Sequence, residues 1–222
     1  MITVVGVPAW RAVEPKSPAG RACEVALAAA AQGAAVELVG RTGDDAAGDA
    51  LVLALGGAHV GHAALLRDPS RPTPVFAAVA SDDHDDAASL FADPGGSPAA
   101  TALDGGPRLE PADVSLGLRY LTAFSVLVVS DEVPAAVLPV AVEAASFAGA
   151  RLVVLLPANG GTPHGLPDDA TVLSAPDVAD DGEFGTFIGW YAAALDRGLE
   201  PAEAFRMAMG AAGWEAAPAD AG

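Results

Sequence analysis

Three acidic residues, Asp180, Asp181 and Glu183, lie in a glycine turn that precedes the last long predicted helix. The turn reads DDGEFG over residues 180–185, and residues 186–197 after it have helical composition. Backbone N–H groups at a helix start can bind an anion, and Gly182 and Gly185 can shape such a turn. Asp181 and Glu183 are candidate bases for the proton of a hydroxyl group. The same carboxylates would repel a phosphate, or they only cap the helix and favour its dipole.

Glu24 and Asp44 are acidic residues near two other predicted helix starts. Glu24 follows Gly20 and lies early in a run of strong helix formers over residues 22–32. It could bind ligand hydroxyls, or it is a helix-start acid without further function. Gly43 and Asp44 belong to a loop before a predicted helix over 46–55, which Asp44 or Asp45 can cap.

The remaining candidates for chemistry predict no metal site. The acidic run over 81–86 matches no known cage of ligands and is typical of a solvated hairpin tip. We place His59 and His62 near the end of a helix and in its following loop, with no third ligand nearby in sequence. Cys23 lies among alanines and is predicted to be a small buried apolar residue.

Composition excludes several classes of protein. The net charge of −18, with a single lysine, argues against nucleic acid or an anionic membrane surface as a partner. No apolar run reaches the roughly 20 residues that a membrane span needs, and the first ten residues resemble a strand more than a signal peptide. One cysteine cannot form an internal disulfide, which fits a cytoplasmic protein.

The predicted elements alternate between strands and helices. This order favours an α/β fold with a mainly parallel sheet. We predict one domain over 1–222, a mobile acidic loop over 81–106 and a frayed tail from residue 215. The expected strands are 2–7, 35–39, 75–80, 125–130 and 151–156, and the expected helices are 22–32, 46–55, 135–147, 186–197 and 201–212.

Two segments resemble the signatures of the ribokinase-like (PfkB-type) carbohydrate kinases. They are AGRACEVALAAAAQGAAVELVGRTGDDAAG over 19–48 and GEFGTFIG over 182–189. The segments VVSDEVP and RLVVLLPAN and the closing helices are also similar to that family. The resemblance implies a three-layer α/β/α sandwich. It also implies that the ligand-binding positions are Gly20, Glu24, Gly43, Asp44 and Gly182.

The departures from the family pattern concern the residues that do the chemistry. Gly185 stands at the position of the family's catalytic Asp, and Glu24 at that of its sugar-contacting Asn. Residues 7–18 are too short for the family's first lid strands and contain no Asp. After residue 176, several strand–helix units that carry the nucleotide-recognition loops are missing.

The resemblance with these departures implies a degenerate sugar-kinase relative with little or no phosphotransfer activity. Such a protein would be a binding module for a sugar or nucleoside, or a protein-interaction module, and would need no cofactor. The alternative is an active carbohydrate or nucleoside kinase, with ATP and Mg²⁺ as cofactors and Glu183 or Asp181 as the base.

Self-association as a homodimer is a further prediction. The strand over 75–80 is what remains of the lid, and without the first lid segment it would expose an unpaired apolar edge. Such an edge invites pairing with a second copy, while the acidic tip discourages open-ended aggregation.

Overall fold

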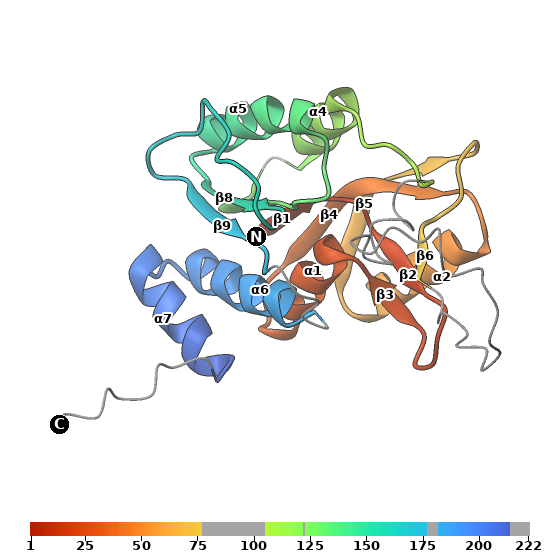
Figure 1. The fold of residues 1–222 in the computed structure, drawn as a ribbon, viewed down its shortest axis with the longest axis horizontal. Coiled ribbons are helices and arrows are strands. Elements are labelled where there is room, and N and C mark those ends of the chain that lie inside the picture. The colour runs from red at the N-terminus through yellow and green to blue at the C-terminus, as the bar shows by residue number, and fades with distance from the viewer. Residues whose placement is uncertain (77–104, 122, 177–181, 214–222) are drawn as a thin grey trace, which may run out of the picture.

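The computed structural model describes residues 1–76, 105–121, 123–176 and 182–213, and its centre is a parallel six-stranded sheet (Figure 1). The strands follow the order β5-β4-β1-β7-β8-β9, and every neighbouring pair is parallel. They are β1 (Ile2–Val5), β4 (Val36–Gly43), β5 (Val60–Asp68), β7 (Val126–Val129), β8 (Arg151–Leu156) and β9 (Thr171–Ser174).

Helices cover both faces of this sheet. One face packs against α1 (Arg21–Ala31), α2 (Ala46–Gly57), α6 (Glu183–Asp196) and α7 (Pro201–Ala211). The other packs against α4 (Pro111–Tyr120), the short 3-10 helix η2 (Ala135–Val137) and α5 (Leu138–Ala148) (Figure 1). The three-layer α/β/α fold expected from the sequence is therefore confirmed.

The central strands are buried on both sides, which explains their continuous apolar sequences. Val128 packs into the core beneath α1 and α6, and its neighbour Val129 packs into the core beneath α4 and α5. Both side chains are at most 1% exposed. The strand over 151–156 has the predicted bounds. The other predicted strands and helices of the α/β/α sandwich differ from the observed ones by a few residues at their ends.

Three elements of the α/β/α sandwich were not expected from the sequence, namely β5, α4 and β9. β5 contains Gly61 near its start, and a glycine inside a strand weakens the strand signal of the sequence. The placement of His62 in a loop was wrong, because His62 lies within β5. His59 lies in the turn before it, with a positive φ of 60°.

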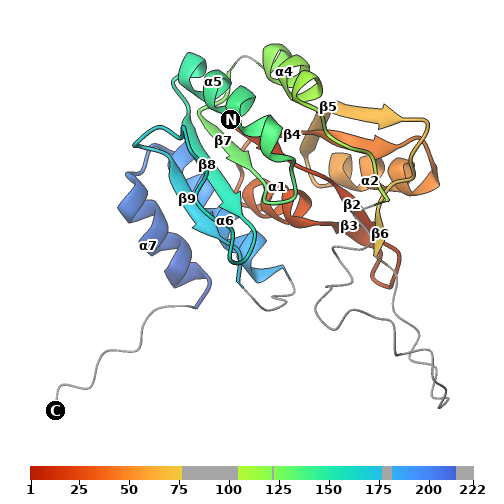
Figure 2. The same ribbon diagram turned by 45° about the horizontal axis from the view of Figure 1, so that its top comes forward.

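A second, three-stranded sheet contradicts the expectation that residues 7–18 are too short for lid strands. β2 (Ala9–Arg11) and β3 (Ser17–Ala19) form an antiparallel hairpin, and β6 (Val75–Phe76) pairs in parallel with β2 (Figure 2). Strands of three residues suffice here, and Pro18 is tolerated because β3 lies at an edge.

The pairing of β6 with β2 removes one premise of the predicted homodimer, which was the absence of a first lid segment. Self-association stays a prediction, and light scattering across a dilution series tests it. The rest of the strand expected over 75–80 lies outside the described residues. So do the acidic run over 81–86, most of the loop expected over 81–106, and the tail from 215.

Cys23 is fully buried, as expected, and burial raises the pKa of its thiol. In the part of the chain that the structure describes, none of the helices is long and apolar enough to cross a membrane.

Candidate functional site

The carboxyl ends of β1 and β7 form the point at which the sheet changes direction. From β1 the chain moves outward through β4 and β5, and it returns to β7 on the other side of β1 before moving out to β8 and β9. Ligands of open parallel sheets bind in the crevice outside the strands at such a switch point. The loops that follow the two strands here begin at Gly6 and at Ser130.

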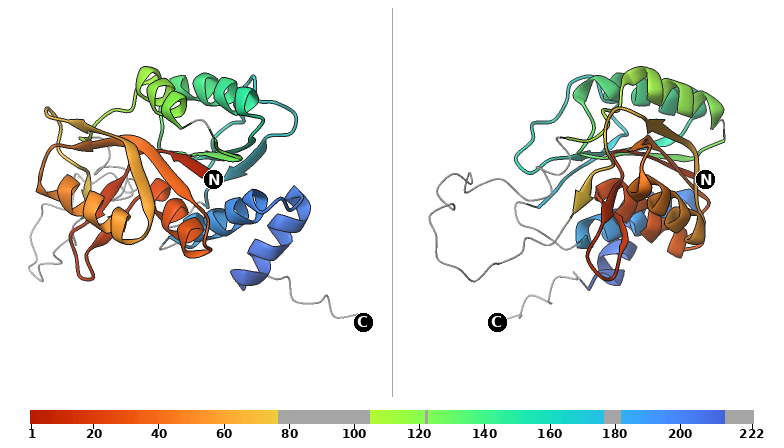
Figure 3. Two further views of the ribbon diagram at one scale, coloured as in Figure 1. Left: turned by 180° about the vertical axis from the view of Figure 1, so that it is seen from behind. Right: turned by 90° about the vertical axis from the view of Figure 1, so that its right-hand side faces the viewer.

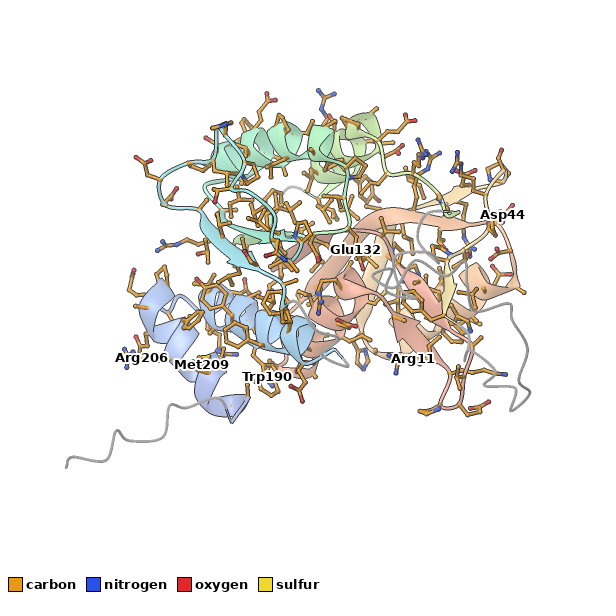
Figure 4. The ribbon with its side chains drawn as sticks, viewed as in Figure 1. Arg11, Asp44, Glu132, Trp190, Arg206 and Met209 are labelled. Atoms are coloured by element: carbon orange, nitrogen blue, oxygen red, sulfur yellow. The ribbon has the colours of Figure 1, made fainter. Side chains whose placement is uncertain are left out.

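Glu132 follows the end of β7 at this switch point, which we call the β1–β7 crevice, and Figure 4 shows the residue near the middle of the molecule. Its Oε1 accepts a hydrogen bond of 3.0 Å from the backbone N–H of Arg21, and its Oε2 accepts one of 3.2 Å from the Ser130 hydroxyl. Burial raises the pKa of the Glu132 carboxyl to about 7, partly offset by the Arg21 N–H and reinforced by the charges of Asp131 and Glu24. Near neutral pH this carboxyl can therefore both donate and accept hydrogen bonds.

Gly20 brings the start of α1 up to Glu132. It is the residue before the helix and has a φ of 86°, a conformation that favours glycine. A Cβ atom there would lie 3.1 Å from the carbonyl oxygen of Val7 and 3.5 Å from Oε1 of Glu132. The predicted ligand position Gly20 is thus placed at the crevice.

Arg21 links two carboxylates at the same place. Its Nη1 donates to Oε2 of Glu24 at 3.1 Å, and its Nε lies 3.8 Å from Oδ1 of Asp131. The guanidinium also lies over the ring of Phe184, 5.0 Å from its centre. Even with Glu132 protonated, two carboxylates face one guanidinium, so this cluster of Arg21, Glu24, Asp131 and Glu132 is acidic overall.

Gly185 lies against α1 and has no room for a side chain. A Cβ atom at Gly185 would be 2.5 Å from both Cβ and Oε2 of Glu24. One turn later, a Cβ atom at Gly189 would be 2.5 Å from Cβ of Ala28 and 2.6 Å from the carbonyl oxygen of Val25. The two glycines let α6 pack closely on α1, a role that the sequence did not reveal.

The side chain of Glu24 covers the first turn of α6. A Cβ atom at Gly182 would lie 3.2 Å from the carboxyl carbon of Glu24, and Gly182 has a φ of 88°. The N–H groups at this helix start are therefore next to a carboxylate of the protein itself. An anionic ligand at this turn would meet that negative charge.

The other two acidic candidates of this turn do not join the cluster. Glu183 is exposed at the start of α6, and Asp181 lies outside the described residues. Across the described ranges, no group of three or more His, Cys, Asp or Glu side chains is arranged to hold a metal ion.

Gly43 and Asp44 lie apart from the crevice. Asp44 is exposed, and Figure 4 shows it at one end of the molecule, well away from Glu132. The ordered carboxylate of this loop is that of Asp45, which accepts hydrogen bonds from the N–H of Gly48 at 2.8 Å and from the N–H and hydroxyl of Thr73 at 2.8 and 2.6 Å. Here the loop has a structural role, because it joins α2 to the segment before β6.

Burial on its own would raise the pKa of Asp45, but the hydrogen bonds from Thr73 and Gly48 and the charge of Arg67 lower it below its usual value. A further hydrogen bond of 3.0 Å joins the N–H of Gly43 to the Thr73 hydroxyl.

Four residues of the crevice were not singled out from the sequence: Arg21, Ser130, Asp131 and Glu132. The signal that could have found them is the abrupt change from the apolar strand VLVV to the polar residues Ser-Asp-Glu. Polar side chains at the carboxyl end of a buried parallel strand point to the ligand edge of the sheet.

The chain is similar to known proteins both in its sequence family and in its structure. The model of the pfkB family carbohydrate kinases matches residues 14–179. The ribokinase of Arabidopsis thaliana, solved with ribose and ATP, is similar at 18% identity and a TM-score of 0.63, with 95% of this chain and 90% of that chain covered. A mutant of phosphofructokinase-2 from Escherichia coli is similar at 15% identity and a TM-score of 0.60, with 96% and 91% covered. At these identities the structures share a fold. No curated protein matches the sequence.

Proposed function

Because this chain belongs to the pfkB family of carbohydrate kinases, we propose that it binds a sugar or nucleoside in the β1–β7 crevice without transferring phosphate to it. The observation that carries this proposal is the packing at Gly185. By its sequence resemblance to the family, Gly185 stands at the position of the catalytic Asp; it has no carboxylate, and a Cβ there would lie 2.5 Å from Cβ of Glu24.

The cost of that change to phosphotransfer is large. A positioned base contributes roughly 10²–10⁴-fold to a rate, and a side chain elsewhere on the turn does not replace it when its geometry differs. Glu183 is exposed at the helix start, so its side chain is not held in a fixed position as a catalytic base would need to be. The exchange of Asp for glycine therefore supports a binding role.

The residues at the start of α6 do not fit the phosphates of ATP. Glu24 places a carboxylate beside Gly182 and Gly185, where an anion would need positive potential. Only residues 175–182 separate the end of β9 from the start of α6, and this number of residues is too small for a strand–helix unit that would carry nucleotide contacts. We therefore derive no step through ATP or Mg²⁺.

The crevice suits a ligand rich in hydroxyl groups. Asp131 can accept hydrogen bonds from hydroxyls, and Glu132, with its pKa of about 7, can both donate and accept. The acidic cluster favours a neutral or cationic ligand over a phosphorylated one. A free sugar or nucleoside meets both conditions.

One observation favours the rival function of an active ATP-dependent kinase. Oε2 of Glu24 lies 2.5 Å from the point at which a Cβ of residue 185 would lie, so a carboxylate is present near the family's catalytic position. The ion pair with Arg21 at 3.1 Å opposes this role, because it engages Oε2, the same atom that would have to accept the proton.

A thermal-shift screen of the full chain tests the proposal. A ligand that binds only the folded state stabilises it by RT ln(1 + [L]/Kd) and thereby raises the melting temperature. We expect a shift with at least one free sugar or nucleoside and none with ATP. Glu132→Gln should weaken that shift, whereas Glu203→Gln on the exposed face of α7 should leave it unchanged. A protein that no sugar or nucleoside stabilises would contradict the proposed binding role.

A further inference from the structure

Residues 157–170 join the parallel strands β8 and β9 without a helix. Connections between parallel strands normally carry a helix that covers one face of the sheet. Here the connection contains three glycines and three prolines and passes beside α5 as a loop, which Figure 1 and the right view of Figure 3 show standing off the sheet. The sheet beneath it is therefore less completely covered.

A pocket of about 790 Å³ lies between this loop, α5 and the ends of β7 and β8. Small-molecule pockets commonly have volumes of about 300–1,000 Å³ and mainly apolar linings. The apolar lining here includes Val129, Leu138, Val142 and Leu156, so the pocket can accept an apolar group of the size of an aromatic ring.

Ser130 and Asp131 line the pocket and also belong to the crevice. The hydroxyl of Ser130 donates to Glu132, and the carboxylate of Asp131 lies 3.8 Å from Nε of Arg21. The apolar pocket is thus continuous with the acidic cluster of Arg21, Glu24, Asp131 and Glu132, because Ser130 and Asp131 border both. A single ligand can place polar groups at the cluster and an apolar group in the pocket.

We propose that the preferred ligand is a glycoside with a neutral apolar aglycone, whose sugar lies at the β1–β7 crevice and whose aglycone lies in the α5 pocket. This inference rests on the proposed function. The aglycone must be uncharged or cationic, because Asp131 and Glu143 line the pocket. Burial of an aromatic group supplies affinity that a free sugar lacks.

Calorimetric titration of the full chain with matched glycosides tests this inference. The ligands are methyl and phenyl β-D-ribofuranoside, methyl and phenyl β-D-glucopyranoside, and phenol. We expect a phenyl glycoside to bind at least about tenfold more tightly than its methyl partner, from the apolar area that the ring buries. Equal affinities of the two partners would overturn the inference.

Variants of α5 locate the effect. Val142→Trp fills the pocket from the helix and should remove the preference for the phenyl over the methyl glycoside. Phe147→Trp is the control, because Phe147 is 95% exposed on the same helix. If Val142→Trp fails to fold, Ser146→Trp introduces the same ring from an exposed position that also lines the pocket. A phenyl preference that survives in the folded variant would contradict the placement.

Failure of the pocket and failure of the proposed function give different results. If none of the glycosides binds, the proposed binding role is contradicted for these sugars. The phenol titration then shows whether the α5 pocket binds an apolar ring. Phenol binding that Val142→Trp removes supports an apolar site, whereas an absence of phenol binding overturns it.

Discussion

The side chain of Glu24 on α1 fills the space that a side chain at Gly185 on α6 would need, because a Cβ atom at residue 185 would lie 2.5 Å from Cβ of Glu24. The carboxylate at this place therefore comes from α1 and not from α6. Packing links the two residue types, because the glutamate at position 24 requires a glycine at position 185. A change at one position alters what the other can tolerate.

Gly185→Ala should lower stability although alanine is the better helix former. The added methyl group overpacks the contact between α1 and α6, which typically costs about 1–3 kcal/mol. Gly56→Ala on α2 is the matched control, since its Cβ would meet only His62 at 3.6 Å. That variant should gain up to about 1 kcal/mol from helix propensity. Urea denaturation of both variants measures the difference.

The pair can be tested as a double-mutant cycle. Glu24→Gly removes the Cβ that crowds residue 185, so Gly185→Ala should cost less in the Glu24→Gly background than in the natural chain. Equal costs in both backgrounds would show that the two positions are independent.

Glu132 should make the protein less stable as pH rises toward neutrality. Its folded pKa of about 7 lies above the ordinary value of 4.5, mainly because it is buried. Between these values the folded state holds a proton that the unfolded state has lost. The stabilising effect of that proton is complete below about pH 4.5 and is lost as pH rises through about 7, by at most about 1.4 kcal/mol per pH unit.

Denaturation midpoints of the natural chain and of Glu132→Gln, measured from pH 4 to pH 8, check this dependence. The amide cannot titrate, so the stability of the natural chain relative to the variant should fall across the window. A difference that stays constant with pH would mean that Glu132 is ionised throughout.

Asp45 and Asp44 are neighbours with different roles, and their alanine variants should separate them. Asp45→Ala removes the cap of α2 and leaves the buried Thr73 without the carboxylate that accepts its hydrogen bonds. Loss of a cap alone costs about 0.5–2 kcal/mol. Asp44→Ala should change stability by less than about 0.5 kcal/mol, because its side chain is exposed.

The pH dependence of the Asp45 effect has the opposite sign to that of Glu132. The hydrogen bonds outweigh burial and lower the pKa of Asp45, so its stabilising effect is present above the ordinary pKa and is lost as pH falls through the folded value. Thermal melts of both alanine variants at pH 7 and in acid measure this. Equal losses from Asp44→Ala and Asp45→Ala would contradict the assigned roles.

The layers of the fold were predictable because their signals are local. The runs SVLVVS and RLVVLL are continuously apolar, which indicates strands that are buried on both faces of a sheet. Alanine-rich helical segments lie between the predicted strands, and this order favours a parallel sheet covered by helices. β2 and β3 were missed because strands of three residues carry almost no periodic signal. The pairing of β2 with β6 also depends on a segment more than 50 positions away in the chain.

The candidate site was predictable only in part, because its chemistry depends on contacts distant in sequence. The N–H that holds Glu132 comes from Arg21, 111 residues earlier in the chain. The sequence resemblance predicts that Gly185 stands where the family has an acid, but the close approach of α6 to α1 that excludes a side chain is a tertiary property. Asp44 was singled out by its position in a motif, whereas the ordered network belongs to Asp45.

The release of ADP from ATP, measured with the purified full chain against a panel of free sugars and nucleosides, tests the proposed loss of phosphotransfer most directly. The packing of Glu24 against Gly185 predicts that ADP release stays at the level of a blank without protein, both with a sugar that stabilises the chain in thermal melts and without it. A sugar-dependent turnover that Glu24→Gln abolishes would contradict this, and would show that the carboxylate on α1 acts as the base of an active kinase.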